Sequence, residues 1–346
     1  MCTAVSFKTE DFYFGRTLDY ESLYPSQVVI TPRRFPLRFR FMEESRTHYA
    51  IIGMAYVHRG YPLYYDGMNE QGLCMAGLNF VGNAVYGRYK ENCLSVAQFE
   101  LIPLILSRCK NVREAVSLLE KTNITDTPFS EDLPTAQLHW MLADRQECIT
   151  LEATDLGINI YRNPVGVLTN NPPFPFQMLN LSGYMNLSAK PAENRFSDKT
   201  ELSHYSRGMG AIGLPGDLSS ASRFVRAAFM KLNSALPKDN TESVSQFFHI
   251  MDTVNQVEGC CVLDDGSCEK TLYTCCMNGD KGIYYYTTYK NRSITAVCMK
   301  EENLDSDRLV AYPLTDKERI EYRNKKSIKR RTDPSEEGPV LAKRKE

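Results

Sequence analysis

The sequence predicts an α+β fold in which helices lie outside stacked β-sheets. Strand-like and helix-like segments follow one another in blocks, and not in the strict alternation of a doubly wound parallel sheet. Several strand segments are apolar on both faces, which is typical of a sheet enclosed between two layers. No glycine-rich nucleotide-binding loop and no repeat of about 20 to 50 residues is present. We therefore expect a single domain over residues 2–322.

The first third of the chain is predicted to consist of strands. An opening hairpin pairs residues 1–7 with residues 12–19. Later runs of β-branched, aromatic and other apolar residues are separated by turn signals such as Asn69-Glu70-Gln71-Gly72. The further strands are expected at residues 27–31, 49–56, 61–65 and 72–80.

Two helices are predicted next, and both are expected to cover a sheet. Ser95 begins a capping-box pattern that predicts a helix ending near Arg108. Asn111 is placed to cap a second helix. That helix has an apolar stripe made of Val112, Ala115, Val116 and Leu119.

Strands and helices then alternate in blocks to the end of the domain. Strands are predicted at 137–143, 148–152, 158–161 and 165–169, followed by a short helix near Met178 and a glycine-rich loop at 208–216. Ser219 or Ser220 is expected to cap a helix over 221–234, and Asn240 or Thr241 a helix that ends at 257. The last strands are expected at 271–276, 282–288 and 293–299.

Composition excludes several classes of protein. The chain has 41 basic and 42 acidic residues, so no overall charge attracts it to nucleic acid or to an anionic membrane. No apolar run approaches the ~18 residues of a transmembrane helix. Eleven cysteines and the lack of a signal peptide predict free thiols and a cytoplasmic location. Residues 323–346 are charged and poor in apolar residues, so we expect a disordered tail, whose Lys329-Arg330-Arg331 leaves contact with nucleic acid open.

Five of the cysteines lie close together in the sequence. No Cys-x-x-Cys pair and no histidine occurs among them, so the spacing does not favour structural zinc. We expect no metal, although a thiol–metal protein stays open as an alternative class. The five residues are Cys260, Cys261, Cys268, Cys275 and Cys276.

Cys2 is the strongest candidate for a catalytic residue. Only Met1 precedes it, and the small cysteine side chain permits removal of that methionine. The new first residue would carry both a thiol and a free α-amine. An α-amine titrates near pH ~8 in model compounds and can take a thiol's proton, so nucleophile and base would reside in one residue. The alternative is an ordinary hairpin with a buried, inert cysteine.

Arg16 and Asp19 lie on the second strand of the same hairpin. A guanidinium next to Cys2 would favour negative charge on sulfur, and a carboxylate could orient the amine. Because side chains alternate along a strand, residues 16 and 19 point to opposite faces. We therefore expect the strand to end or bulge between them, so that both can reach Cys2.

Three further residues are candidates for an amide-cleaving site. Thiolate attack on a carbonyl needs donors for the oxyanion, and Asn79 and Asn170 each end an apolar strand. Each asparagine is also ordinary turn chemistry. Arg223 falls in the first turn of a predicted helix, where the helix dipole disfavours a cation, so another interaction is expected to hold it there.

Several motifs, in order along the chain, resemble the choloylglycine hydrolase family, which comprises bile salt hydrolases and penicillin V acylases among the N-terminal-nucleophile hydrolases. The resemblance extends from Cys2 to about Leu314. The motifs are Met1-Cys2-Thr3, Gly15-Arg16-Thr17-Leu18-Asp19, Gly67-Met68-Asn69-Glu70-Gln71-Gly72-Leu73, Ala76-Gly77-Leu78-Asn79-Phe80, Leu138-His139-Trp140, Val167-Leu168-Thr169-Asn170-Asn171-Pro172, Gly213-Leu214-Pro215-Gly216-Asp217 and Ser222-Arg223-Phe224.

The resemblance implies a four-layer αββα sandwich of two mainly antiparallel sheets, removal of Met1, and a homotetramer that uses no cofactor and no metal. It implies that Cys2 is nucleophile and base, that Asn79 and backbone near Cys2 bind the oxyanion, and that Asp19 positions the amine. Arg16 and Arg223 would tune the electrostatics, and Asn170 would complete the site.

The resemblance also implies a substrate class. Asparagine at position 79 resembles the residue found in the bile salt branch of the family, whereas tyrosine at this position is typical of penicillin acylases. We therefore expect hydrolysis of glycine- or taurine-conjugated bile acids. An acylase for penicillin V or N-acyl amino acids is the alternative. A steroid needs a wide apolar pocket, and the candidate walls are Leu18, Tyr24, Tyr61, Phe80 and Phe129.

Overall fold

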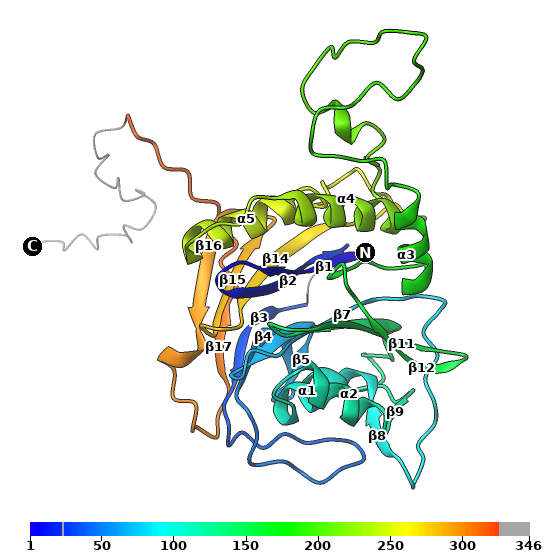
Figure 1. The fold of residues 1–346 in the computed structure, drawn as a ribbon. Helices are drawn as coiled ribbons and strands as arrows, with labels where there is room; N and C mark the ends of the chain where they lie inside the picture. Colours follow the sequence, from blue (N-terminus) through cyan, green and yellow to red (C-terminus); the bar gives the residue numbers. More distant parts are fainter. Residues whose placement is uncertain (23, 325–346) are drawn as a thin grey trace, which may run out of the picture.

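The computed structural model describes residues 1–22 and 24–324. Two β-sheets stack face to face, and helices cover the outer face of each sheet (Figure 1). Helices α4 and α5 pack on the first sheet, and helices α1 and α2 lie under the second. The expected α+β class and the αββα order of layers are confirmed. The expected tail lies, from residue 325 onward, outside the described residues.

The first sheet contains the strand that begins with Cys2. Neighbouring strands pair antiparallel throughout. Six consecutive residues, Cys2 to Phe7, are buried, because one face of the strand meets the second sheet and the other meets helices. In spatial order the strands are β13 (Val167–Leu168), β1 (Cys2–Lys8), β2 (Phe12–Tyr20), β14 (Lys270–Asn278), β15 (Ile283–Thr288) and β16 (Asn291–Cys298).

The second sheet is larger and also antiparallel. Its edge strand β17 comes from the end of the described chain and pairs with β3 from the beginning. In spatial order the strands are β12 (Gly157–Arg162), β11 (Cys148–Thr154), β10 (Leu138–Ala143), β7 (Cys74–Asn79), β6 (Asp66–Asn69), β4 (Ile51–His58), β3 (Ser26–Thr31) and β17 (Val310–Pro313), with β5 (Tyr61–Tyr64) paired to β4.

The helices and a small parallel pair of strands complete the fold. The helices are α1 (Leu101–Arg108), α2 (Val112–Leu119), α3 (Phe174–Ser182), α4 (Ser220–Asn233) and α5 (Asn240–Asp252). Single 3-10 turns lie at Gln98–Glu100, Met209–Ala211 and Met299–Glu301. The parallel strands are β8 (Leu94–Ala97) and β9 (Thr122–Thr125).

Local capping explains most helix starts. Asn111 and Ser219 cap α2 and α4 as expected, each accepting a hydrogen bond from a backbone N–H three residues on. The cap of α5 is Asp239, and this helix ends at Asp252 instead of 257. The expected helix start at Ser95 is wrong, because that residue lies in β8.

The hydroxyl group of Ser95 bonds to the backbone of Lys90 instead of to a helix start. Helix α1 begins six residues later, where the Glu100 carboxylate accepts from the Ala97 amide. Among the described residues, none of the helices combines the length and the apolar composition that a membrane crossing requires.

Because neighbouring strands are antiparallel, the ends of several strands that are far apart in the sequence lie together at one end of the sheets. Cys2 begins β1, Asp19 lies near the end of β2, and β14 begins beside it. In the second sheet, Asn79 ends β7. This end therefore collects residues that are far apart in the sequence.

Candidate active site

The sulfur of Cys2 lies between the two sheets. Cys2 pairs with Leu18 and Ala4 with Arg16, so the Cys2 and Arg16 side chains share a face of the first sheet. The Arg16 guanidinium donates to Cys2 Sγ at 2.5 Å and to the carbonyl oxygen of Gly77, in the second sheet, at 2.7 Å. A buried cation in contact with the sulfur stabilises negative charge there.

Arg16 is held in its charged form by buried negative neighbours. Burial alone lowers the pKa of Arg16, but negative charge at Cys2 and Asp66 outweighs burial and raises it above the ordinary value. Asp66 is fully buried, and it accepts hydrogen bonds from the hydroxyl groups of Tyr273 and Tyr284 at 2.5 and 2.7 Å.

Asp19 lies on the opposite face of β2. The expectation that this strand ends or bulges before Asp19 is wrong: β2 continues through Tyr20, and the register shifts in its partner β14. The Asp19 carboxylate accepts from Thr271 at 2.7 Å and from Thr17 at 3.2 Å. Burial raises the pKa of Asp19, and the nearby Arg223 opposes that rise.

Asp19 contacts the chain end through its backbone, and both contacts are made to Met1, so they exist only while Met1 is retained. Its N–H donates to the carbonyl oxygen of Met1 at 2.9 Å, and its carbonyl oxygen accepts from the Met1 amine at 2.6 Å. Arg16 therefore contacts the sulfur from one face of the sheet, and the role of the Asp19 carboxylate in orienting the Cys2 amine stays a prediction.

Asn170 connects most of the predicted residues. Its Oδ1 accepts from the backbone nitrogen of Cys2 at 2.9 Å and from Arg223 Nη2 at 2.7 Å. Its Nδ2 donates to the carbonyl oxygen of Asn79 at 2.8 Å. Once Met1 is removed, the nitrogen that Asn170 binds becomes the α-amine of Cys2.

Arg223 is buried in the first turn of α4 and points at the nucleophile. Its Nη1 donates to the carbonyl oxygen of Cys2 and to Thr3 Oγ1, both at 2.6 Å. Its Nε donates to the carbonyl oxygen of Leu218 at 3.0 Å. Burial lowers the pKa of Arg223, and Asp19 and Cys2 oppose that change. These contacts explain why a cation lies at an unfavourable end of the helix dipole.

The side-chain amide of Asn79 is free to bind a ligand. Asn79 is half-buried, and its carbonyl oxygen is fixed by Asn170. Among the described residues, no group hydrogen-bonds to its side-chain amide. A donor group that is held on a strand end and left unpaired is suited to accept negative charge on a substrate oxygen.

Glu269 is a charged neighbour that the sequence interpretation did not identify. Its carboxylate, which is almost fully buried, pairs with the Met1 amine at 2.8 Å. The partners are 268 residues apart in the chain. No local pattern marks such a residue, because its partner is the chain terminus.

Three of the five predicted pocket residues belong to one run of aromatic contacts. Tyr24 stacks on Tyr56, with ring centroids 5.1 Å apart. Tyr56 contacts His58, and His58 contacts Phe129 at 5.7 Å. Tyr61 contacts Phe129, and both line a cleft of about 240 Å³.

This aromatic run connects to the nucleophile through hydrogen bonds. Arg16 contacts the carbonyl oxygen of Tyr65 at 3.5 Å. Ser26 Oγ donates to the carbonyl oxygen of Tyr24 at 2.9 Å and lies 3.3 Å from the Tyr65 hydroxyl group. Leu18 packs on the core next to Cys2.

Phe80 is the exception among the predicted pocket walls. It has no exposed surface, and it stacks on His139 with ring centroids 4.3 Å apart. Its assignment as a pocket wall stays a prediction that requires the ring to move.

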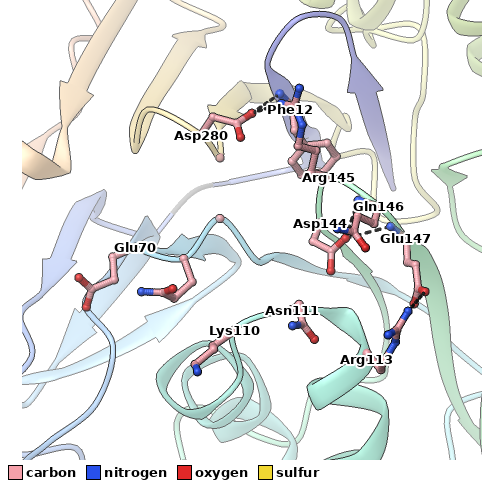
Figure 2. Close-up of a pocket in the computed structure, with 13 residues that line it drawn as sticks. Phe12, Glu70, Lys110, Asn111, Arg113, Asp144, Arg145, Gln146, Glu147 and Asp280 are labelled. Carbon is pink, nitrogen blue, oxygen red and sulfur yellow. Dashed lines mark hydrogen bonds and ion pairs between the residues drawn. The ribbon is translucent and has the colours of Figure 1, made fainter.

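A larger cleft of about 470 Å³ lies at the other end of the strands (Figure 2). It is lined by Phe12, by the turn at residues 70–72, by the start of α2, by the β10–β11 turn and by residues 279–280, and four of its charged side chains pair with one another. Arg145 pairs with Asp280, and Arg113 with Glu147. This cleft contains none of the predicted site residues.

The five neighbouring cysteines do not gather into a metal site. Cys275 and Cys276 are buried in β14, where consecutive side chains point to opposite faces, and the other three lie in the preceding loop. Within residues 1–22 and 24–324, no three His, Cys, Asp or Glu side chains are arranged to hold a metal ion.

Comparisons with known proteins agree with this geometry. Residues 2–312 match the profile of the linear amide C–N hydrolases of the choloylglycine hydrolase family. A bile salt hydrolase/transferase from Lactiplantibacillus plantarum is 51% identical over 314 residues, which are 91% of this chain and 97% of that protein.

Solved structures show the same fold. The C2A mutant of the conjugated bile acid hydrolase from Clostridium perfringens has a TM-score of 0.87 at 35% identity, covering 94% of this chain and all of that one. Penicillin V acylase from Agrobacterium tumefaciens shares the fold with a TM-score of 0.72 at 20% identity, covering 89% and 90% of the two chains. The chain, with its buried Cys2–Arg16–Asn170–Arg223 cluster, belongs to the choloylglycine hydrolase family of linear amide C–N hydrolases.

Proposed function

We propose that this protein hydrolyses the amide bond of glycine- or taurine-conjugated bile acids, with Cys2 as nucleophile after removal of Met1. The observation that carries the proposal is that Cys2 has two separate hydrogen-bond partners, one at its sulfur and one at its nitrogen. Arg16 contacts its sulfur, and Asn170 contacts the nitrogen that becomes its α-amine. A nucleophile and a base in one residue therefore have separate, buried partners.

The contacts support a two-step mechanism. The α-amine of Cys2 takes the thiol proton, and the sulfur attacks the substrate carbonyl carbon. The side-chain amide of Asn79 donates to the oxyanion. The protonated amine then gives its proton to the leaving nitrogen as the C–N bond breaks, which leaves an acyl-thioester. Water, deprotonated by the same amine, attacks the thioester carbon. The C–S bond breaks and frees the bile acid, and the thiolate recovers the proton from the amine.

The substrate class rests on the relatives and on Asn79. Proteins named bile salt hydrolase or conjugated bile acid hydrolase match about nine-tenths of this chain. The aromatic run from Tyr24 to Phe129 offers apolar surface for a steroid. Burying extra apolar area at ~25 cal/mol per Å² raises catalytic efficiency when that binding energy holds the amide against the nucleophile.

The test compares glycocholate, taurocholate and penicillin V at one pH. Either bile salt should be cleaved with much higher kcat/KM than penicillin V. Equal efficiency, or a preference for penicillin V, would replace this proposal with the acylase alternative.

Acyl transfer is a second candidate activity. The 51% identical relative is named hydrolase/transferase. The acyl-thioester on Cys2 can be attacked by a free amine in place of water. Adding a different amino acid to the glycocholate reaction should then give a new conjugate of that amino acid with cholate. If no such conjugate forms at high amine concentration, the enzyme is a hydrolase and not a transferase.

We propose that the enzyme is a cytoplasmic homotetramer that acts through a single domain over residues 2–322 without metal or cofactor. All eleven cysteines are free thiols, as a reducing compartment favours. The chain between α3 and α4 projects from the body (Figure 1) and exposes Met185, Phe196 and Tyr205, each more than 80% accessible. Such exposed apolar groups favour assembly. Sedimentation of wild type and Phe196→Asp tests it, since an unchanged mass would contradict this role of the segment.

A further inference from the structure

His139 is a buried histidine whose two ring nitrogens both face acceptors. It lies in β10 with no exposed surface. Nε2 is 2.9 Å from the carbonyl oxygen of Thr169, and Nδ1 is 3.1 Å from Glu152 Oε1. A carbonyl oxygen cannot donate, so Nε2 carries a hydrogen and donates it to Thr169. Nδ1 faces the carboxyl group of Glu152, so both ring nitrogens have a polar partner.

The bond to Thr169 fixes the peptide plane that leads into Asn170. The carbonyl group of Thr169 and the N–H group of Asn170 belong to one planar unit. His139 holds the oxygen of this unit, and Ser220 Oγ accepts from its N–H at 2.8 Å. Two partners on opposite ends of a rigid plane determine where the Asn170 side chain begins.

Glu152 fixes the same segment a few residues later. Its Oε1 also accepts from the backbone nitrogen of Phe174, the first residue of α3, at 2.9 Å. Its Oε2 is buried and has no hydrogen-bond partner among the described residues. The His139–Glu152 pair therefore clamps both ends of the segment that carries Asn170.

The imidazole ring also supports the second asparagine. Phe80 follows Asn79 directly, and its ring lies parallel to the His139 ring, with an interplanar angle of 6°. The strand that carries His139 pairs with β7 through Leu138 and Asn79. One side chain thus contacts the neighbours of both asparagines of the site.

We propose that His139, fixed by Glu152, is a positioning residue that aligns Asn170 and Asn79 with the Cys2 nucleophile. The inference rests on the proposed amide hydrolysis and deepens it. The ring of His139 hydrogen-bonds to Glu152 and Thr169 and not to Cys2, so it acts through the two asparagines. A misplacement of about 1 Å at such a site costs on the order of 100-fold in rate.

Two matched substitutions separate the two hydrogen bonds of the ring. Glutamine places its amide nitrogen near the position of Nε2, so His139→Gln keeps the bond to Thr169. Asparagine is shorter and reaches the position of Nδ1, so His139→Asn keeps a partner for Glu152 and loses Thr169. Ser220→Ala releases the other end of the same peptide plane and serves as an independent variant.

We measure kcat and KM for glycocholate at a temperature where circular dichroism shows each variant folded. His139→Asn and Ser220→Ala should lower kcat by about 10- to 100-fold with KM changed less than about threefold. His139→Gln should retain kcat within about fivefold of wild type. Equal losses in the Gln and Asn variants, or losses that appear in KM alone, would show that the pair only stabilises the core.

The substrate preference of wild type tests the proposed function independently of the His139 variants. If wild type prefers penicillin V to glycocholate, the substrate proposal fails and the same variants are compared on penicillin V. A crystal structure of His139→Asn supplies a readout that needs no turnover. We expect Asn170 Oδ1 to move out of hydrogen-bond distance of the Cys2 nitrogen, and an unmoved Asn170 would overturn the inference.

Discussion

Replacing Asn79 with alanine should separate catalysis from stability. The Asn79 side chain is half-buried and forms no hydrogen bond to a described residue, while its backbone is held by Asn170 and by pairing with β10. Its removal should therefore change the free energy of unfolding by at most about 0.5 kcal/mol, as at ordinary sites. For a chain of this size that is a shift in Tm of less than about 1 °C.

The expected effect on the reaction is far larger. Removing one oxyanion donor from a preorganised site lowers kcat by about 100- to 1,000-fold, or roughly 2.7 to 4 kcal/mol of transition-state stabilisation. The loss should appear in kcat and leave KM nearly unchanged, because the donor acts on charge that is absent from the bound substrate.

The assay is initial-rate release of glycine from glycocholate, with Tm measured on the same samples. Asn79→Asp is the matched variant, since it keeps the shape and removes both donors, and it should be at least as slow as Asn79→Ala. Wild-type kcat in Asn79→Ala would refute the assignment and move the oxyanion site to backbone N–H groups.

Cys2→Ser should abolish turnover of glycocholate while leaving the circular dichroism spectrum unchanged, because a hydroxyl group is a poorer nucleophile than a thiol at neutral pH; rapid hydrolysis by the variant lacking Met1 would exclude the covalent route. Asn170→Asp keeps the acceptor for the Cys2 nitrogen but places a second oxygen against the carbonyl oxygen of Asn79. We expect kcat to fall by about 5- to 100-fold, in line with the ~1 to 3 kcal/mol cost of a buried, unpaired acceptor. An unaffected kcat would show that the Asn170–Asn79 hydrogen bond is dispensable. Burial raises the pKa of Glu100 to about 7, from an ordinary 4.5, so its contribution to stability is complete below pH ~4.5 and is lost as pH rises through ~7, about 2 to 4 kcal/mol in all. Urea unfolding should show a lower free energy of unfolding at pH 8 than at pH 5 in wild type, and a smaller difference between the two pH values in Glu100→Gln. The same difference in both proteins would contradict this prediction.

Local patterns predicted the parts of the fold that depend on neighbours in the sequence. The opening hairpin and the caps at Asn111 and Ser219 need only a few adjacent residues, and all are found. Strands β6, β8, β9 and β17 were missed. Strands β8, β9 and β17 are each defined by a partner that is distant in the chain. Ser95 shows the same limit, since pairing of its segment with β9 overrides a good capping pattern.

The site was predictable where a residue type implied its chemistry. Cys2, Arg16, Asn170 and Arg223 form one cluster of contacts. The face occupied by Asp19 follows from strand alternation, but the expected end or bulge of β2 before Asp19 was wrong, because β2 continues through Tyr20.

Local spacing gave no role to the supporting residues, although His139 lies in one of the motifs that carry the family resemblance. Glu269 pairs with the chain terminus, and the His139–Glu152 pair joins two strands to a strand end. Buried polar pairs of this kind are specified by the packed fold and not by spacing along the chain.

The central claim is that Cys2, freed of Met1, carries the acyl group during turnover. The direct measurement is a mass spectrum of wild-type enzyme quenched with acid during cleavage of glycocholate, followed by peptide mapping. We expect a first residue of Cys2 and a cholyl thioester on that residue alone, which disappears when substrate is exhausted. A chain that retains Met1 while fully active, or an acyl group on any of the other ten cysteines, would contradict it.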